Sequence, residues 1–222
     1  TDFSGSPGDV RAEPEDVDYL LRMANRTFPS AALAARDVVS TWAGVRPLLA
    51  DTSREASMAT REHRIVEHEP GFVSVLGGKL TTYRRMAAET LDLLVRNDPA
   101  GGGDRPACRT DRIPLPGGRG FPGTGPAIQG FEESLSRRFG IDAEIARHLR
   151  AAYGVRAPGV LAGAAGSADG VRRLVPELPV TRAELTWSLL REGVVHPADF
   201  LLRRSSIWFK AVSPASAAEK VA

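Results

Sequence analysis

A stretch rich in glycine and proline, residues 98–127, divides this chain into two parts that follow different hydrophobic patterns. The part before it mixes helical spacing with β-branched and aromatic runs, whereas the part after it has mainly helical spacing. Because the stretch holds few large apolar residues, we expect a linker or long loop there. The predicted organisation is α+β: a domain over 1–97, the linker, a helical domain over 128–213 and a frayed tail over 214–222.

The first domain is predicted to contain strands between two helices. Pro14 and the two acids after it are typical of a first helical turn, and apolar residues then recur at helical spacing. Three β-branched or alternating runs favour strands, at 38–45, 61–69 and 72–76. The third is expected to be the more buried, and Pro70-Gly71 predicts a hairpin turn before it. Gly77-Gly78 ends that strand, and a second helix follows.

The second domain is predicted to be helical from several local signals. One apolar stripe consists of Ile141, Ile145, Leu149 and Ala152. Gly154 is expected to end that helix. Thr181 and Glu184 have the T-x-x-E spacing of a capping box ahead of a further helix. Pro197 is expected to open a short helix that runs through Arg203-Arg204.

Composition excludes several classes of function. The net charge of +2 is too small to indicate nucleic-acid binding, and the arginines are scattered. No apolar run reaches the length of a membrane span, and the first residues lack the pattern of a signal peptide. The single cysteine, Cys108, permits no disulfide within the chain and is expected to be an inert thiol. We therefore expect a cytoplasmic protein with no nucleic-acid partner.

The strongest local signal is the run Gly77-Gly78-Lys79-Leu80-Thr81-Thr82, where a predicted strand meets a predicted helix. A glycine pair lets the backbone approach a flat ligand closely, because no Cβ atom stands in the way. The helix that follows directs free N–H groups and its positive end toward the glycines, which suits an electron-rich group such as a flavin pyrimidine oxygen. The alternative is an ordinary strand-to-helix turn with threonine caps.

Three cations lie at the ends of the predicted strands. Arg46 follows the first strand, Arg61 begins the second and Lys79 follows the third. If the strands share a sheet, these cations gather at related ends. Two planar guanidinium groups and one compact ammonium group complement a phosphomonoester, which carries nearly two negative charges. The alternative is three separate solvated surface charges.

Two other patterns are set aside. Residues 118–123 match G-x-G-x-x-G, but no clear strand precedes them, and Gly125 and Pro126 interrupt a following helix, so a loop is expected. The four histidines are His63, His68, His148 and His196. None of their spacings suits a metal, so no metal site is predicted. His63 shares a strand face with Arg61 and is an alternative site residue, but we expect a packing or surface role for it, and a structural role for His148.

These residues together resemble one family. The segments that carry the likeness are Trp42-Ala43-Gly44-Val45-Arg46-Pro47-Leu48, Arg61-Glu62-His63 and Gly77-Gly78-Lys79-Leu80-Thr81-Thr82-Tyr83-Arg84, in this order. They resemble the aerobic FAD-dependent glycerol-3-phosphate dehydrogenases. Residues 128–212 are similar to the helical C-terminal domain of that family, so the resemblance covers nearly the whole chain outside the linker. The implied fold is the end of a DAO-like FAD oxidoreductase sheet followed by a helical C-terminal domain.

The resemblance also implies an activity and its residues. The family oxidises glycerol 3-phosphate at C2 to dihydroxyacetone phosphate, with hydride passing to FAD and electrons to a membrane quinone. Arg46 and Arg61 would hold the substrate phosphate, and Lys79 would be a catalytic residue that also binds substrate. The cofactor-facing residues would be Gly77, Gly78, Leu80, Thr81 and Thr82. Peripheral attachment to the cytoplasmic membrane and a homodimer are both compatible with the resemblance.

The N-terminal dinucleotide-binding fold of the family has no counterpart in this sequence. We therefore expect a fragment that is inactive without an FAD-binding half. One alternative is an α-glycerophosphate oxidase, which uses the same site but passes electrons to oxygen. The other is an inactive fragment that acts as a helical interaction module.

Overall fold

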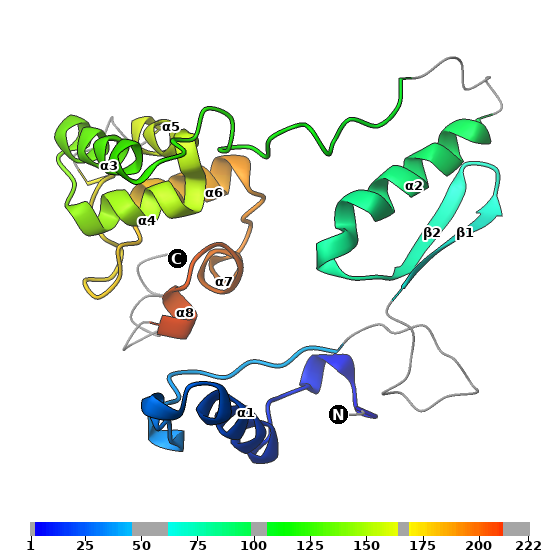
Figure 1. The fold of residues 1–222 in the computed structure, drawn as a ribbon, viewed down its shortest axis with the longest axis horizontal. Helices are drawn as coiled ribbons and strands as arrows, with labels where there is room; N and C mark the ends of the chain where they lie inside the picture. Colours follow the sequence, from blue (N-terminus) through cyan, green and yellow to red (C-terminus); the bar gives the residue numbers. More distant parts are fainter. Residues whose placement is uncertain (1–2, 46–61, 99–105, 164–168, 211–222) are drawn as a thin grey trace. The chain divides into compact units, whose positions relative to one another are not determined.

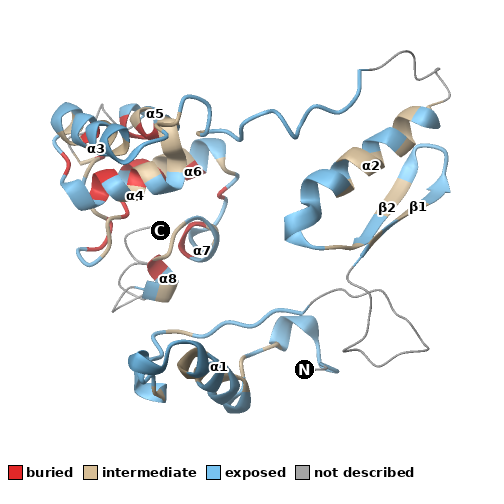
Figure 2. Cartoon of the chain, in the orientation of Figure 1, coloured by how far each residue is buried: buried red, intermediate tan, exposed pale blue. Residues whose placement is uncertain are grey.

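The computed structural model describes residues 3–45, 62–98, 106–163 and 169–210 (Figure 1). The chain divides into two compact units, one of residues 1–16 with 42–113 and the other of residues 17–41 with 114–222. Every buried residue of the described ranges lies in the second unit, between Leu135 and Ile207 (Figure 2). The first unit therefore has helix and sheet but no closed core within the described residues.

Helix α1 (Pro14–Thr27) begins at the predicted proline and has Glu15 and Asp16 in its first turn. The helix has no buried residue. Its last turns hold the following segment through Asn25, whose side chain donates to Leu33 O at 2.8 Å and accepts from Leu33 N at 2.7 Å. Short 3₁₀ turns flank the helix: η1 (Pro7–Asp9), η2 (Pro29–Ala31) and η3 (Ala35–Asp37).

The strand predicted over 38–45 is wrong. Residues 38–45 form neither helix nor strand, and Val39 and Trp42 expose 80% and 74% of their surfaces. The β-branched and aromatic residues there satisfy strand propensity, but a strand also needs a partner that accepts its ladder hydrogen bonds. Among the described residues, no segment pairs with this run.

Strands β1 (His63–Glu69) and β2 (Phe72–Gly77) form an antiparallel hairpin in the predicted place. Gly71 has a φ of +81°, which the tight turn requires. The register pairs His63 with Gly77, and a bulge interrupts it between Glu67 and Glu69. The second of these strands was expected to be the more buried, but neither strand has a buried residue, and Phe72 of the second is 59% exposed.

The hairpin leads into helix α2 (Tyr83–Arg96) through the 3₁₀ turn η5 (Leu80–Thr82). Figure 1 shows α2 lying along the hairpin, where it packs against β2 and is bonded to β1 through His63. Within its described residues, the sheet of the first unit thus has two strands, and α2 lies against it. Because a hairpin and one helix bury little apolar area, their apolar side chains stay partly exposed to solvent.

In the part of the second unit that the structure describes, seven helices and turns follow α3 (Gly125–Phe139). They are α4 (Ala143–Tyr153), η6 (Gly154–Arg156), α5 (Ala157–Ala162), α6 (Arg182–Arg191), α7 (Pro197–Asp199), the π-helical turn η7 (Phe200–Arg204) and α8 (Ile207–Lys210). Helix α3 begins three residues before the helical region expected from 128, because Pro126 lies in its first turn, where proline is favoured. The same finding overturns the expectation that Gly125 and Pro126 interrupt a helix.

Two apolar clusters form the core of the second unit. The first joins α3, α4, α5 and α6 and consists of Leu135, Ile141, Ile145, Ala146, Leu149, Ala157, Val160, Leu161 and Ala183. The second consists of Leu174, Val175, Val180, Val194, Phe200, Leu201 and Ile207. Three residues of the predicted stripe are buried, whereas Ala152 is exposed and Ala146 takes its place in the core. Within the described residues, no helix has the combined length and apolarity to cross a bilayer.

Candidate functional site

The predicted site residues Gly77 to Thr82 form one continuous turn between β2 and α2. Gly77 and Gly78 have φ angles of +69° and +87°, and Lys79 returns to extended backbone. Two successive positive φ angles reverse the chain within a short distance, and glycine adopts them without steric cost. The turn then passes directly into η5 and the first turn of α2.

Gly78 is packed against the rest of its own unit. A Cβ atom at this position would lie 2.6 Å from both the Sδ and Cε atoms of Met86, and 3.2 Å from the Cβ atom of His63. Sequence reasoning explained this glycine by close approach of a ligand. The structure supplies an internal reason, because Met86 of α2 and His63 of β1 fill the space beside it.

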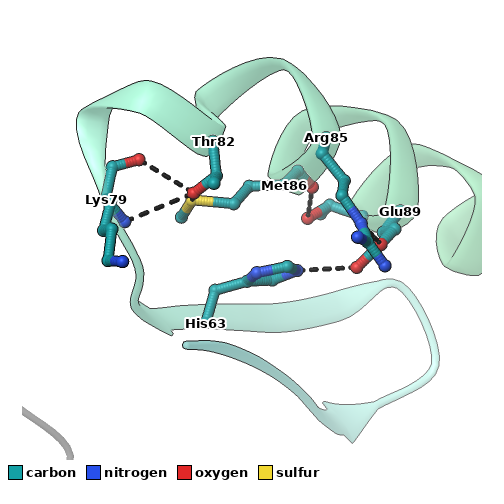
Figure 3. A network of polar contacts seen from close by, with 7 residues as sticks. His63, Lys79, Thr82, Arg85, Met86 and Glu89 are labelled. Atoms are coloured by element: carbon teal, nitrogen blue, oxygen red, sulfur yellow. Dashed lines mark hydrogen bonds and ion pairs between the residues drawn. The ribbon is translucent and has the colours of Figure 1, made fainter. Parts of the chain in front are cut away.

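Thr82 anchors the turn to Lys79. Its hydroxyl lies 3.0 Å from Lys79 O and 3.4 Å from Lys79 N, so it can donate to the carbonyl and accept from the N–H group (Figure 3). The same hydroxyl lies 3.6 Å from Met86 Sδ. The Thr82 side chain therefore caps the 3₁₀ turn η5 and not α2 itself, and it fixes the backbone of the candidate catalytic lysine.

One side of the turn is open. Lys79 is exposed, and Leu80 exposes 89% of its surface. The 3₁₀ turn uses the N–H groups of Thr82 and Tyr83, which donate to Lys79 O and Leu80 O. The N–H groups of Leu80 and Thr81 precede the first bond of that turn and have no acceptor within it. An ammonium group, an apolar side chain and two backbone donors thus lie together on consecutive residues.

A polar network beside the turn was not predicted. The Nε2–H group of His63 donates to Glu89 Oε2 over 2.6 Å, and Arg85 Nε donates to Glu89 Oε1 over 2.6 Å (Figure 3). The Arg85 guanidinium, followed by the His63 ring, holds the pKa of Glu89 below its ordinary range. Of this network, the sequence indicates only the Arg85–Glu89 pair, because these two residues lie four apart on one helix.

Arg46 and Arg61 lie outside the described residues. Their gathering with Lys79 at one place stays a prediction. His68 belongs to the same hairpin as His63 but contacts different groups. Its Nε2 lies 2.9 Å from Ser74 Oγ, and its ring centroid lies 5.1 Å from that of Phe72.

Cys108 lies in a groove at the other end of α2. The groove has a volume of about 600 Å³ and is lined by Leu91, Asp92, Val95, Arg96 and residues 106–110. The thiol is exposed, and the Thr110 hydroxyl at 3.1 Å lowers the pKa of Cys108 from its usual value. The surroundings of this thiol favour its thiolate more than its sequence context indicated.

A second polar cluster is buried in the helical unit. Glu184 is 3% exposed and accepts hydrogen bonds from Thr181 N at 2.7 Å, Thr181 Oγ1 at 3.1 Å and His148 Nε2 at 2.8 Å. The predicted capping box at the start of α6 is therefore confirmed. His148 has the structural role expected of it. Within the described ranges, no group of three or more His, Cys, Asp or Glu residues has an arrangement that could hold a metal.

Comparisons with known proteins agree with one another. Residues 108–222 match the family described as the C-terminal domain of alpha-glycerophosphate oxidase. The chain is 35% identical over 195 residues to an aerobic glycerol-3-phosphate dehydrogenase of Staphylococcus epidermidis, covering 86% of this chain and 34% of that protein. It is 31% identical over 210 residues to a glycerol-3-phosphate dehydrogenase of Synechocystis, covering 92% and 36%. The chain thus spans about a third of the length of these relatives.

A solved structure supports the same relationship. The X-ray structure of the glycerol-3-phosphate dehydrogenase from Bacillus halodurans, complexed with FAD, superimposes with a TM-score of 0.72 at 30% sequence identity. The match covers 99% of this chain and 41% of that chain. The likeness therefore includes the hairpin, the turn and α2 as well as the helical unit.

Proposed function

Because this chain belongs to the FAD-dependent glycerol-3-phosphate dehydrogenase family and carries its C-terminal domain, we propose that it contributes to the oxidation of sn-glycerol 3-phosphate to dihydroxyacetone phosphate. It does so together with an FAD-binding half of the enzyme. The observation that carries the proposal is the turn from Gly77 to Thr82, where an exposed lysine and open backbone donors meet at the start of α2.

The turn fits one edge of a flavin. The N–H groups of Leu80 and Thr81 and the positive end of α2 suit an electron-rich ring edge. The exposed Leu80 side chain suits the apolar face of the ring. Bound FAD supplies the hydride acceptor, and the residues of this chain supply position and electrostatic field. Gly77, Gly78, Leu80, Thr81 and Thr82 are the residues proposed to face it.

The described residues offer no phosphate loop for the dinucleotide part of FAD. The G-x-G-x-x-G run over 118–123 follows a turn instead of a strand, and Gly117 and Gly120 have positive φ angles there. We therefore assign the turn one part of the flavin site and assign the rest to the FAD-binding half.

Lys79 is proposed to act on the substrate. Its ammonium group is exposed at the end of the hairpin, while Thr82 fixes its backbone. In that position a cation can polarise the C2 hydroxyl or orient the phosphate, and both roles stabilise negative charge close to the reacting carbon. Arg46 and Arg61 are proposed to bind the phosphate, which Arg does with a planar, bidentate fork.

We propose a membrane quinone as the electron acceptor. A quinone acceptor implies a protein in the cytoplasm that is peripherally attached to the membrane. We also propose that the enzyme is a homodimer. A specific observation also favours oxygen as acceptor: the matching C-terminal family is described from an alpha-glycerophosphate oxidase, whereas the full-length relatives are named dehydrogenases. An oxidase and a dehydrogenase would bind the substrate with the same residues.

The test is glycerol-3-phosphate-dependent dye reduction and flavin content, measured on the 222-residue chain alone and joined to the FAD-binding half of a relative. We expect activity only in the joined, flavin-loaded protein, and a loss of activity in Lys79→Ala and Arg61→Ala. A fully flavin-loaded joined protein without activity would refute the dehydrogenase function and favour the interaction-module alternative. Hydrogen peroxide formation in air and quinone reduction are measured in the same preparation. Hydrogen peroxide formation indicates an oxidase, and quinone reduction indicates a dehydrogenase.

A further inference from the structure

His63 occupies a position from which it contacts both sides of the candidate site. It is the first residue of β1, and its register partner on β2 is Gly77, the first residue of the turn. Its ring points toward α2 and is only 16% exposed, with Nε2 2.6 Å from Glu89 Oε2. One side chain therefore joins the strand that pairs with the turn to the helix that follows the turn.

The packing around Gly78 adds a second connection. The Cβ atom of His63 and the sulfur and methyl group of Met86 lie on the side of Gly78 where a side chain would project. Thr82, which bonds to Lys79, also contacts Met86 Sδ at 3.6 Å. A continuous chain of contacts thus leads from His63 through Gly78 and Met86 to Thr82 and Lys79. Figure 3 shows His63, Met86, Thr82 and Lys79.

Glu89 is held in place on its other side. Arg85 lies one turn earlier on α2 and donates to Glu89 Oε1, so both carboxylate oxygens of Glu89 have a partner. A carboxylate bonded at both oxygens loses rotational freedom and presents one orientation to the imidazole. His63 is therefore tied to a fixed point on α2 and not to a freely moving side chain.

We propose that His63 is a positioning residue, which holds the Gly77–Gly78 turn against α2 and so fixes the place of Lys79. The inference rests on the proposed function of Lys79 and deepens it. His63 itself need not touch substrate or flavin. Its effect is transmitted through the contacts of Gly78, Met86 and Thr82 and through the pairing with Gly77.

Loss of the His63 side chain should affect turnover more than substrate binding. Misplacement of a catalytic group by about an ångström lowers the rate by up to about a hundredfold. Because the substrate phosphate is assigned mainly to Arg46 and Arg61, substrate binding should change less than turnover. For His63→Ala in the joined, flavin-loaded enzyme we expect kcat to fall by about tenfold or more, with KM changed by less than about threefold.

A readout without flavin tests the coupling directly. The chain has three methionines, so ¹³C-methyl labelling gives a simple spectrum in which Met86 is assigned by substitution. In the 222-residue chain, His63→Ala should shift the Met86 methyl signal and the backbone amide signals of Lys79 and Thr82. His63→Gln should restore most of these signals and most of kcat, because its amide nitrogen can donate to Glu89 from about the same place as Nε2.

His68→Ala is the matched control, since it removes a histidine from the same strand that bonds to Ser74. Glu89→Ala provides a second variant with the β1 sequence intact, and should reproduce the effect of His63→Ala. Equal signals in His63→Ala and His68→Ala, with kcat within twofold of the parent, would overturn the inference. Shifted Lys79 signals in a chain whose joined parent enzyme is inactive would support the coupling and refute the proposed function.

Discussion

The carbonyl oxygen of Gly117 occupies the space that a Cβ atom on Gly154 would need. The relationship is nearly reciprocal, because a Cβ atom on Gly117 would collide with the carbonyl oxygen of Tyr153. Both glycines have positive φ angles, +89° and +57°, and Val155 N donates to Gly117 O at 3.0 Å. This contact fastens the segment before α3 to the end of α4.

Gly154→Ala should therefore lower the free energy of unfolding of the helical unit by about 2–4 kcal/mol. Roughly 1–2 kcal/mol is expected from a non-glycine residue at positive φ, and the remainder from moving backbone atoms that cannot rotate away. Gly140→Ala is the control, since Gly140 has a φ of +67° but open space around it. Urea unfolding measures both variants, and equal losses would contradict the role of the Gly117 contact.

Gly78→Ala should loosen the hairpin and α2. The expected loss is about 1–3 kcal/mol, from the positive φ angle and from displacement of Met86. Gly71→Ala shares the positive φ angle, at +81°, but meets open space. Hydrogen exchange of the amides in 72–86 should rise more in Gly78→Ala than in Gly71→Ala. Adding Met86→Ala should reduce the difference in exchange between Gly78→Ala and Gly71→Ala, and an unchanged difference would exclude Met86 as its cause.

Glu184→Ala should destabilise the helical unit by about 2–4 kcal/mol, because the buried Thr181 N–H group and the His148 ring lose their acceptor. Glu184→Gln keeps an acceptor for Thr181 N and should cost clearly less. Glu177→Ala removes an exposed carboxylate from the same unit and serves as the control. Chemical denaturation measures the unfolding free energy of the three variants. A loss of unfolding free energy in Glu177→Ala similar to that in Glu184→Ala would count against the buried cap.

Asp142 should contribute to the pH dependence of stability. The Ile145 N–H group, at 2.8 Å, and then Arg173 lower the pKa of this N-cap carboxylate. A lowered folded-state pKa contributes stability that is present above the unfolded pKa of about 4 and is lost as pH falls through the folded value. Asp142→Asn keeps the cap but cannot titrate.

The unfolding free energy of Asp142→Asn should therefore fall less steeply below about pH 4 than that of the parent. Glu133→Gln, on the exposed side of α3, is the control for the loss of a carboxylate. Denaturation curves recorded between pH 3 and pH 7 provide the comparison. Parallel curves for Asp142→Asn and the parent would exclude Asp142 as a contributor.

Elements marked by local signals were predicted well. Pro14 with its acids, the Pro70-Gly71 turn, the Thr181–Glu184 box and Gly154 each act on backbone groups within a few residues, so their effect is readable along the chain. The likeness to a family was readable for a similar reason, since it rests on the order of short motifs.

The segment 38–45 is not a strand, because strand formation also depends on residues far away in the sequence. Its residues have the propensity for a strand, but propensity does not supply the neighbouring edge that pairs with it. The small extent of burial of both strands of the hairpin has a related cause. An apolar run indicates a face that can be covered, and only the other elements of the unit determine how far it is covered.

By itself, the sequence determined the starts of α1, α6 and α7, the end of α4, the hairpin and the Gly77–Lys79 turn, because these depend on residues that are close along the chain. Tertiary structure alone decided that His63 meets Glu89 across 26 positions, that His148 meets Glu184 across 36, and that Gly117 meets Gly154. Such contacts depend on how whole elements pack, since a side chain's partner is set by the helix or strand that lies against it in space.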